Sequence, residues 1–158
     1  MSLLEAPACA DNGNGTPLAP VANDAVVIDT NIALDLLLFH NPEVDVLRVR
    51  IESGTLRWLA TARMGEELQR VLHYPHIAAR LQDDADAHRR QLLAQRDAWV
   101  HLQADAPRSI YVCKDADDQC FIDLAVAHSA LLLSKDAQVL KLRKRLAKLG
   151  VVVSRQLA

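Results

Sequence analysis

Four acidic side chains stand where a metal-binding cluster could form. Asp29 directly follows the apolar run 25–28, and Asp136 stands three residues after the end of the apolar run 131–133. Glu67 and Asp118 lie in segments with helical periodicity. Carboxylates that are brought together repel one another, and a divalent cation with a preference for oxygen ligands is the usual remedy. These residue types therefore indicate a carboxylate metal site.

Each of these acids also has a structural interpretation. Asp29 and Asp136 precede helical segments, where an aspartate N-cap accepts hydrogen bonds from free backbone N–H groups. Taken alone, neither is evidence for catalysis. Asp115 and Asp117 stand near the start of the segment that holds Asp118. We interpret both as structural residues whose negative charges stabilise the positive, N-terminal end of a helix dipole.

Helical projection separates the two neighbouring glutamates of segment 62–73. Its apolar stripe consists of Met64, Leu68, Val71 and Leu72. Glu66 points away from this stripe and is predicted to be a surface residue. Glu67 lies at the border of the stripe, so it is the glutamate that can reach a site at the edge of the core.

The same projection applied to segment 117–129 places Asp118 near the centre of the inward face. That face is formed by Phe121, Ile122, Ala125 and Ser129. Asp123 falls well off the face and is predicted to be exposed. An inward carboxylate such as Asp118 is costly to bury unless a cation or a hydrogen-bond donor meets it.

Short apolar runs alternate with helical segments along the chain. The predicted strands cover 25–28, 56–60, 99–102, 131–134 and 151–153. The predicted helices cover 31–39, 42–52, 62–73, 83–97, 117–129 and 136–148. This alternation predicts an α/β fold in which helices cover both faces of a mainly parallel sheet, with ligands bound at the carboxyl ends of the strands.

The length and composition of the chain exclude several classes of function. The 158 residues suit one domain at 25–158 after a flexible leader at 1–24, which is rich in proline and glycine. The net charge of −2 excludes binding to nucleic acid by bulk charge alone. We find no secretory signal or membrane segment, and three cysteines without CxxC spacing fit a reducing cytoplasm.

Several other side chains are interpreted as structural or surface residues rather than as functional ones. We expect His73 and His76 to be surface histidines because Pro75 interrupts the helix between them, and Trp58 and Trp99 to pack in the core. The basic run of the last helix is interpreted as a solvated face rather than an RNA contact. It comprises Lys141, Arg143, Lys144, Arg145 and Lys148.

Four motifs in this order resemble those of the PIN (PilT N-terminus) domain family, especially the branch of VapC-like toxins of toxin–antitoxin systems. The motifs are Val27-Ile28-Asp29-Thr30-Asn31, Glu67-Leu68 followed by Val71-Leu72 and Pro75, Asp115-x-Asp117-Asp118-x-x-Phe121 with Ala125, and Leu133-Ser134-x-Asp136. The resemblance extends from Val26 to Val153. Two departures, Ala116 in place of proline and Ser134-Lys135 in place of threonine and a small residue, remove no acid.

The resemblance implies a three-layer α/β/α sandwich with about five strands and an endoribonuclease that hydrolyses RNA with Mg²⁺ or Mn²⁺. Asp29, Glu67, Asp118 and Asp136 would be the catalytic and metal-binding residues. Asn31 would orient Asp29, the first acid, and Ser134 would supply the hydroxyl that precedes Asp136, the last acid. The implied partners are an RNA substrate, an antitoxin protein and a second copy in a homodimer, in the cytoplasm and without a membrane.

Three other site types lack residues that they need. A phospho-acceptor receiver domain requires paired acids after the first strand, and a haloacid-dehalogenase-like phosphatase requires an aspartate where Asn31 stands. A dinucleotide-binding domain requires a glycine-rich first turn, which Thr30-Asn31-Ile32 does not provide. A non-catalytic RNA- or partner-binding module on the same scaffold stays open.

Overall fold

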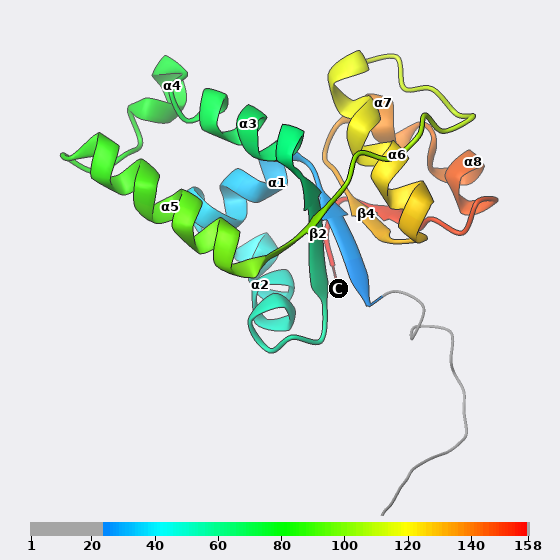
Figure 1. Ribbon diagram of the computed structural model, residues 1–158, viewed down its shortest axis with the longest axis horizontal. Coiled ribbons are helices and arrows are strands. Elements are labelled where there is room, and N and C mark those ends of the chain that lie inside the picture. The colour runs from blue at the N-terminus through cyan, green and yellow to red at the C-terminus, as the bar shows by residue number, and fades with distance from the viewer. Residues whose placement is uncertain (1–23, 158) are drawn as a thin grey trace, which may run out of the picture.

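The computed structural model describes residues 24–157, in which a five-stranded parallel sheet lies between two layers of helices (Figure 1). The strand order is β3-β2-β1-β4-β5, and every neighbouring pair is parallel. The strands are β1 (Ala25–Ile28), β2 (Arg57–Thr61), β3 (Val100–Gln103), β4 (Leu131–Leu133) and β5 (Val153–Ser154). The α/β sandwich predicted from the sequence is therefore confirmed.

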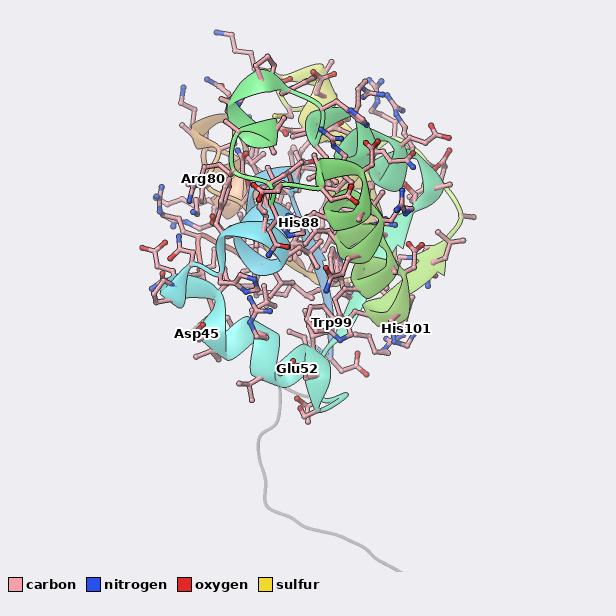
Figure 2. The ribbon with its side chains drawn as sticks, turned by 90° about the vertical axis from the view of Figure 1, so that its left-hand side faces the viewer. Asp45, Glu52, Arg80, His88, Trp99 and His101 are labelled. Carbon is pink, nitrogen blue, oxygen red and sulfur yellow. The ribbon has the colours of Figure 1, made fainter. Side chains whose placement is uncertain are left out.

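One face of the sheet is covered by the first half of the chain. Its helices are α1 (Thr30–Leu34), a π-helix η3 (Asp35–Phe39), a 3₁₀ turn η4 (Pro42–Val44), α2 (Asp45–Glu52), α3 (Ala62–Val71), α4 (Pro75–Ala78) and α5 (Ala85–Trp99). Figure 2 looks onto this layer, with Asp45 and Glu52 at the two ends of α2 and with His88 and Trp99 on α5. Val26 and Ile28 of β1 face its core.

The second face is covered by the end of the chain. Its elements are the 3₁₀ turn η5 (Ala116–Asp118), α6 (Gln119–His128), α7 (Ala137–Leu140) and α8 (Arg143–Ala147). Ala25 and Val27 face this core, so β1 is buried on both sides, as its continuous apolar run predicts. Trp58 is buried, and Trp99 packs against the first core.

The topology determines where a ligand can bind. The chain moves from β1 to β2 and β3 on one side and then crosses to β4 and β5 on the other. The direction of winding therefore reverses between β1 and β4. In sheets of this kind, ligands bind in the crevice outside the carboxyl ends of the strands at such a reversal. Asp29 follows β1 at this point, and Ser134 follows β4.

Several predicted helices are divided differently in the structure. Segment 31–39 is α1 followed by the π-helix η3, which ends where His40 takes a left-handed conformation with φ of 51°. Segment 136–148 is split into α7 and α8. The sequence indicated no helix at Pro75–Ala78, although α4 forms there: Tyr74 is extended, as a residue before proline prefers, and Pro75 then starts a new turn.

The predicted exposure of Asp123 is wrong. Asp123 is buried, and its Oδ1 accepts hydrogen bonds from the Ser109 backbone N–H and from Gln119 Nε2, both at 2.8 Å. The projection assumed one buried face, but α6 lies between the sheet and the segment before it in the chain. Ser129, predicted to face inward, is exposed and ends α6 in a left-handed conformation.

The leader predicted at residues 1–24 and Cys9 lie outside the described residues, apart from Asp24. Cys113 is buried and Cys120 is half-buried, and within residues 24–157 neither forms a disulfide. Among residues 24–157, the helices are too short or too polar to cross a bilayer.

Candidate metal centre

A cavity of about 290 Å³ opens at the carboxyl ends of β1 and β4. In Figure 1, α3 and α4 lie on one side of these two strands, and α6 and α7 lie on the other. All four acids selected from the sequence line it, together with Asp115. The remaining lining residues are Thr30, Asn31, Leu34, Val71, Tyr74, His76 and Ile77. The fold therefore brings residues that are 107 positions apart, Asp29 and Asp136, to one cavity.

Asp29 is the buried base of this cavity, with 4% of its surface exposed. Its Oδ1 accepts a hydrogen bond of 2.8 Å from the Ile32 backbone N–H, and so it is the N-cap of α1. Its Oδ2 accepts a hydrogen bond of 2.6 Å from the fully buried Ser134 Oγ. The structural and the functional interpretations of Asp29 are thus compatible, because the cap also points the carboxylate at the cavity.

Ser134 connects the first acid to the last. Its hydroxyl donates to Asp29 and accepts a hydrogen bond of 3.1 Å from the Asp136 backbone N–H. Asp136 in turn caps α7 by accepting from the Gln138 N–H at 2.7 Å. Asn31, which the resemblance assigned to orienting Asp29, is exposed on the cavity wall, and the hydrogen bonds to Asp29 come from Ser134 and from backbone N–H groups.

Asp115, Asp118 and Asp136 form the tightest group. One carboxylate oxygen from each lies within 4.8 Å of the other two. Asp118 Oδ2 is buried and has no hydrogen-bond partner among residues 24–157. A buried carboxylate oxygen without a donor is costly, so this atom is available to a cation.

Burial and neighbouring charge both act on the protonation of this group. Burial, followed by the negative charges of Asp136 and Asp115, raises the pKa of Asp118 to about 7. Burial also raises the pKa of Asp29, although the hydrogen bond from Ser134 opposes the change. Clustered carboxylates thus hold protons more tightly than isolated ones, which is the behaviour expected of a cation site without its cation.

Glu67 lies on the cavity wall, whereas Glu66 does not. Glu67 is half-buried, and its Oε2 accepts a hydrogen bond of 2.8 Å from Thr30 Oγ1. Glu66 is exposed and lines a separate cleft on the other side of α3, with Arg70 and His73. The helical projection of α3 predicted this difference from the apolar stripe alone.

Three residues of this cavity whose side chains could contact a ligand, Asp115, Tyr74 and His76, were not selected from the sequence as site residues. Asp115 caps η5 through the Asp117 N–H and was interpreted as purely structural, although its motif with Asp118 was visible. Tyr74 and His76 reach the cavity through α4, and the signal that could have located them is Pro75 as a helix start. Asp117 is exposed and does not line the cavity.

An ion pair fixes the segment that carries Asp136. Lys135 Nζ pairs with the buried Asp35 of η3 and lies 3.9 Å from Glu43 Oε1. Asp35 was visible as the single charge in the apolar run 32–39 but was not selected. The pair ties the chain after β4 to the helix after β1, so it holds the two halves of the acidic site together.

Replacement of Lys135 by methionine is expected to lower the free energy of unfolding by about 1–3 kcal/mol. The change leaves Asp35 buried without its cation, and the partial exposure of Lys135 reduces the cost below that of a fully buried pair. Urea denaturation of the wild type, Lys135→Met and the exposed control Lys141→Met measures the effect. Equal midpoints for all three proteins would show that solvent screens the pair.

The residues of the cavity fit a hard divalent cation. They provide several carboxylate oxygens, a buried oxygen without a donor, and helix starts whose positive dipole ends lie near the acids. The basic residues of the predicted last helix, which lie in and around α8, are exposed: Lys141, Arg143, Lys144, Arg145 and Lys148.

Comparison with known proteins identifies the scaffold. A family model described as a PIN domain matches residues 25–138, which include all five acids of the cavity. No curated protein matches the chain.

Proposed function

The chain belongs to the PIN domain family, whose members are generally nucleases, and from this premise we propose that it is a metal-dependent endoribonuclease. The observation that carries the proposal is Asp118 Oδ2, a buried oxygen without a donor among the described residues, beside carboxylates of Asp115 and Asp136. Such an arrangement favours a bound cation over a structural role. Hydrolysis of a phosphodiester bond is one of the reactions for which carboxylate-held cations are suited.

Asp118, Asp136 and Asp115 would hold Mg²⁺ or Mn²⁺, with Asp29 and Glu67 close by in the same cavity. When bound, such an ion lowers the pKa of water and offsets the charge that develops on the phosphate. Ser134 and the Ile32 N–H hold Asp29 in a fixed orientation, and Thr30 does the same for Glu67. The site therefore needs little rearrangement to receive an ion.

The choice of RNA as substrate and the biological role rest on the motif resemblance. We propose that the protein is the toxin of a toxin–antitoxin pair, that an antitoxin protein inhibits it, and that it acts in the cytoplasm as a homodimer. Asp29-Thr30-Asn31 after β1 and Asp136 after β4 support this assignment, whereas Ser134-Lys135 departs from the usual pattern of that branch without removing an acid.

Incubation of the full chain with mixed single-stranded and structured RNA tests the proposal. We expect internal cleavage in Mg²⁺ or Mn²⁺ and none after addition of a chelator, followed by recovery when metal is restored. Gel electrophoresis of end-labelled RNA distinguishes internal cuts from trimming. Tight RNA binding without cleavage in either metal would reject the nuclease and favour a non-catalytic binding module.

The two adjacent glutamates provide a matched pair of variants. Glu67→Gln is expected to reduce the cleavage rate by about tenfold to a thousandfold, because it removes a charge beside the metal group. Glu66→Gln is expected to change the rate by less than about twofold, since Glu66 is exposed outside the cavity. Initial rates at saturating metal measure both, and a reversed order would contradict the helical projection.

A further inference from the structure

The cavity at the acids has two chemically different halves. The acidic half is formed by Asp29, Glu67, Asp115, Asp118 and Asp136. The other half of the lining holds apolar and aromatic side chains, which come from α1, α3 and the turn into α4: Leu34, Val71, Tyr74, His76 and Ile77. The acids come from the ends of β1 and β4, from the turn before α6 and, in the case of Glu67, from α3 itself. A ligand that complements both halves of the cavity is charged at one end and flat or apolar at the other.

The side chain of Tyr74 is the most informative part of the second half. It is 44% exposed, so its aromatic ring is not packed into the core as large aromatic rings commonly are. The rings of Tyr74 and His76 lie 6.3 Å apart with 37° between their planes, so they do not cover each other face to face. An open aromatic face at the rim of a cavity is available to another planar group.

The geometry of α3 connects the two halves. Glu67, Val71 and Tyr74 are spaced i, i+4 and i+7, so they follow one side of the helix and its continuing turn. The Tyr74 N–H donates to the Val71 carbonyl at 2.9 Å, which extends this turn beyond the helix end. At a rise of about 1.5 Å per residue, Tyr74 lies about 10 Å along the axis from Glu67.

We propose that Tyr74 and His76 form a base-binding subsite for the nucleotide next to the phosphate held at the acids, an inference that rests on the proposed nuclease function. A single-stranded nucleic acid has this pattern of a charged backbone beside planar bases, and aromatic side chains bind such bases by stacking. Val71 and Leu34 supply the apolar floor beneath the stacked base. Because stacking is tolerant of base identity, the subsite favours purines by their larger surface rather than one sequence.

The test compares strands with and without bases. Fluorescence anisotropy measures the binding of the full chain to a labelled oligoadenylate RNA and to an abasic strand of equal length. Both are measured in Ca²⁺, with a gel to check that the RNA stays intact. Tyr74→Leu is expected to weaken oligoadenylate binding by about 5- to 100-fold. The same substitution is expected to leave abasic binding unchanged.

Matched variants separate stacking from other effects. Tyr74→Phe keeps the ring and is expected to bind within about threefold of the wild type. His76→Ala is expected to weaken oligoadenylate binding, whereas His73→Ala, exposed on the other side of α3, is not. Since Tyr74 is exposed, thermal melting of Tyr74→Leu is expected to match the wild type.

Two outcomes would overturn the subsite: oligoadenylate binding by Tyr74→Leu equal to that of the wild type, or an equal loss for the abasic strand. The second would show that the α4 wall contacts the backbone. The proposed function fails separately. If the wild type cleaves RNA and Tyr74→Leu does so with an unchanged KM, the subsite is rejected and the nuclease stands. If the wild type binds bases through Tyr74 but never cleaves, the nuclease is rejected and the subsite stands.

Discussion

Asp118→Asn is expected to abolish metal-dependent RNA cleavage while the protein stays folded. The substitution keeps the shape of the side chain but removes the charge of the group whose Oδ2 is buried without a donor among the described residues. Loss of a charged metal ligand removes several kcal/mol of stabilisation, which corresponds to a rate decrease of about a thousandfold or more. Single-turnover cleavage of labelled RNA in Mg²⁺ and in Mn²⁺ measures the loss.

Asp117→Asn is the matched control for this variant. Asp117 is the adjacent residue in the same turn, but it is exposed and outside the cavity, so its variant is expected to cleave at the wild-type rate. Asp29→Asn and Asp136→Asn are expected to lose cleavage as Asp118→Asn does, since both acids line the cavity. Full activity of Asp118→Asn in a preparation free of other nucleases would refute the assignment of this centre.

The second large effect is a pH-dependent stabilisation by metal. The pKa of Asp118 is raised to about 7 in the folded protein, whereas an unfolded aspartate titrates near its ordinary value of 3.8. Between these values the folded state binds more protons than the unfolded state, so the stability of the metal-free protein falls as pH rises from about 4 to about 7. Above pH 7 the charged cluster repels itself, and a cation relieves that repulsion.

Melting curves of the metal-free and metal-loaded protein at pH 5.5 and pH 8 measure this effect. At pH 8, Mg²⁺ or Mn²⁺ at a hundredfold excess over Kd adds about 2.7 kcal/mol of stability, or roughly 5–10 °C in Tm. At pH 5.5 the increase is expected to be smaller, because protons compete for Asp118. Mn²⁺ is expected to act at a lower concentration than Mg²⁺.

Asp118→Asn checks the origin of this pH dependence. Without its metal, the variant is expected to melt at a higher temperature than the wild type at pH 8. This difference is expected to be smaller at pH 4, where Asp118 is protonated in the folded wild type and close to half protonated in the unfolded chain. The rise in its Tm on addition of Mg²⁺ or Mn²⁺ is expected to be smaller than that of the wild type. Identical melting curves with and without millimolar metal, in wild type and variant alike, would show that the acids do not form a cation site.

Local sequence determined most of the scaffold. The continuous apolar run 25–28 specified a strand buried on both faces, and the alternation of such runs with helical segments specified a parallel sheet. Parallel strands present their carboxyl ends at one edge, so Asp29 and Asp136 could be expected to converge. The period of α3 separated Glu67 from Glu66 because one face of that helix packs on the core and the other meets solvent.

Tertiary structure decided what a one-faced helix projection could not. Asp123 is buried because a second segment covers α6, and the Ser109 N–H and Gln119 satisfy its charge. Asp115 lies at the cavity because the fold packs η5 against the end of β4, which brings its carboxylate close to those of Asp118 and Asp136. Tyr74 lines the cavity because it continues the side of α3 that carries Glu67 and Val71, and His76 lines it because the chain turns at Pro75 into α4. Local sequence sets the period and the ends of each element, whereas long-range packing sets which side chains meet, since those contacts join residues far apart in the chain.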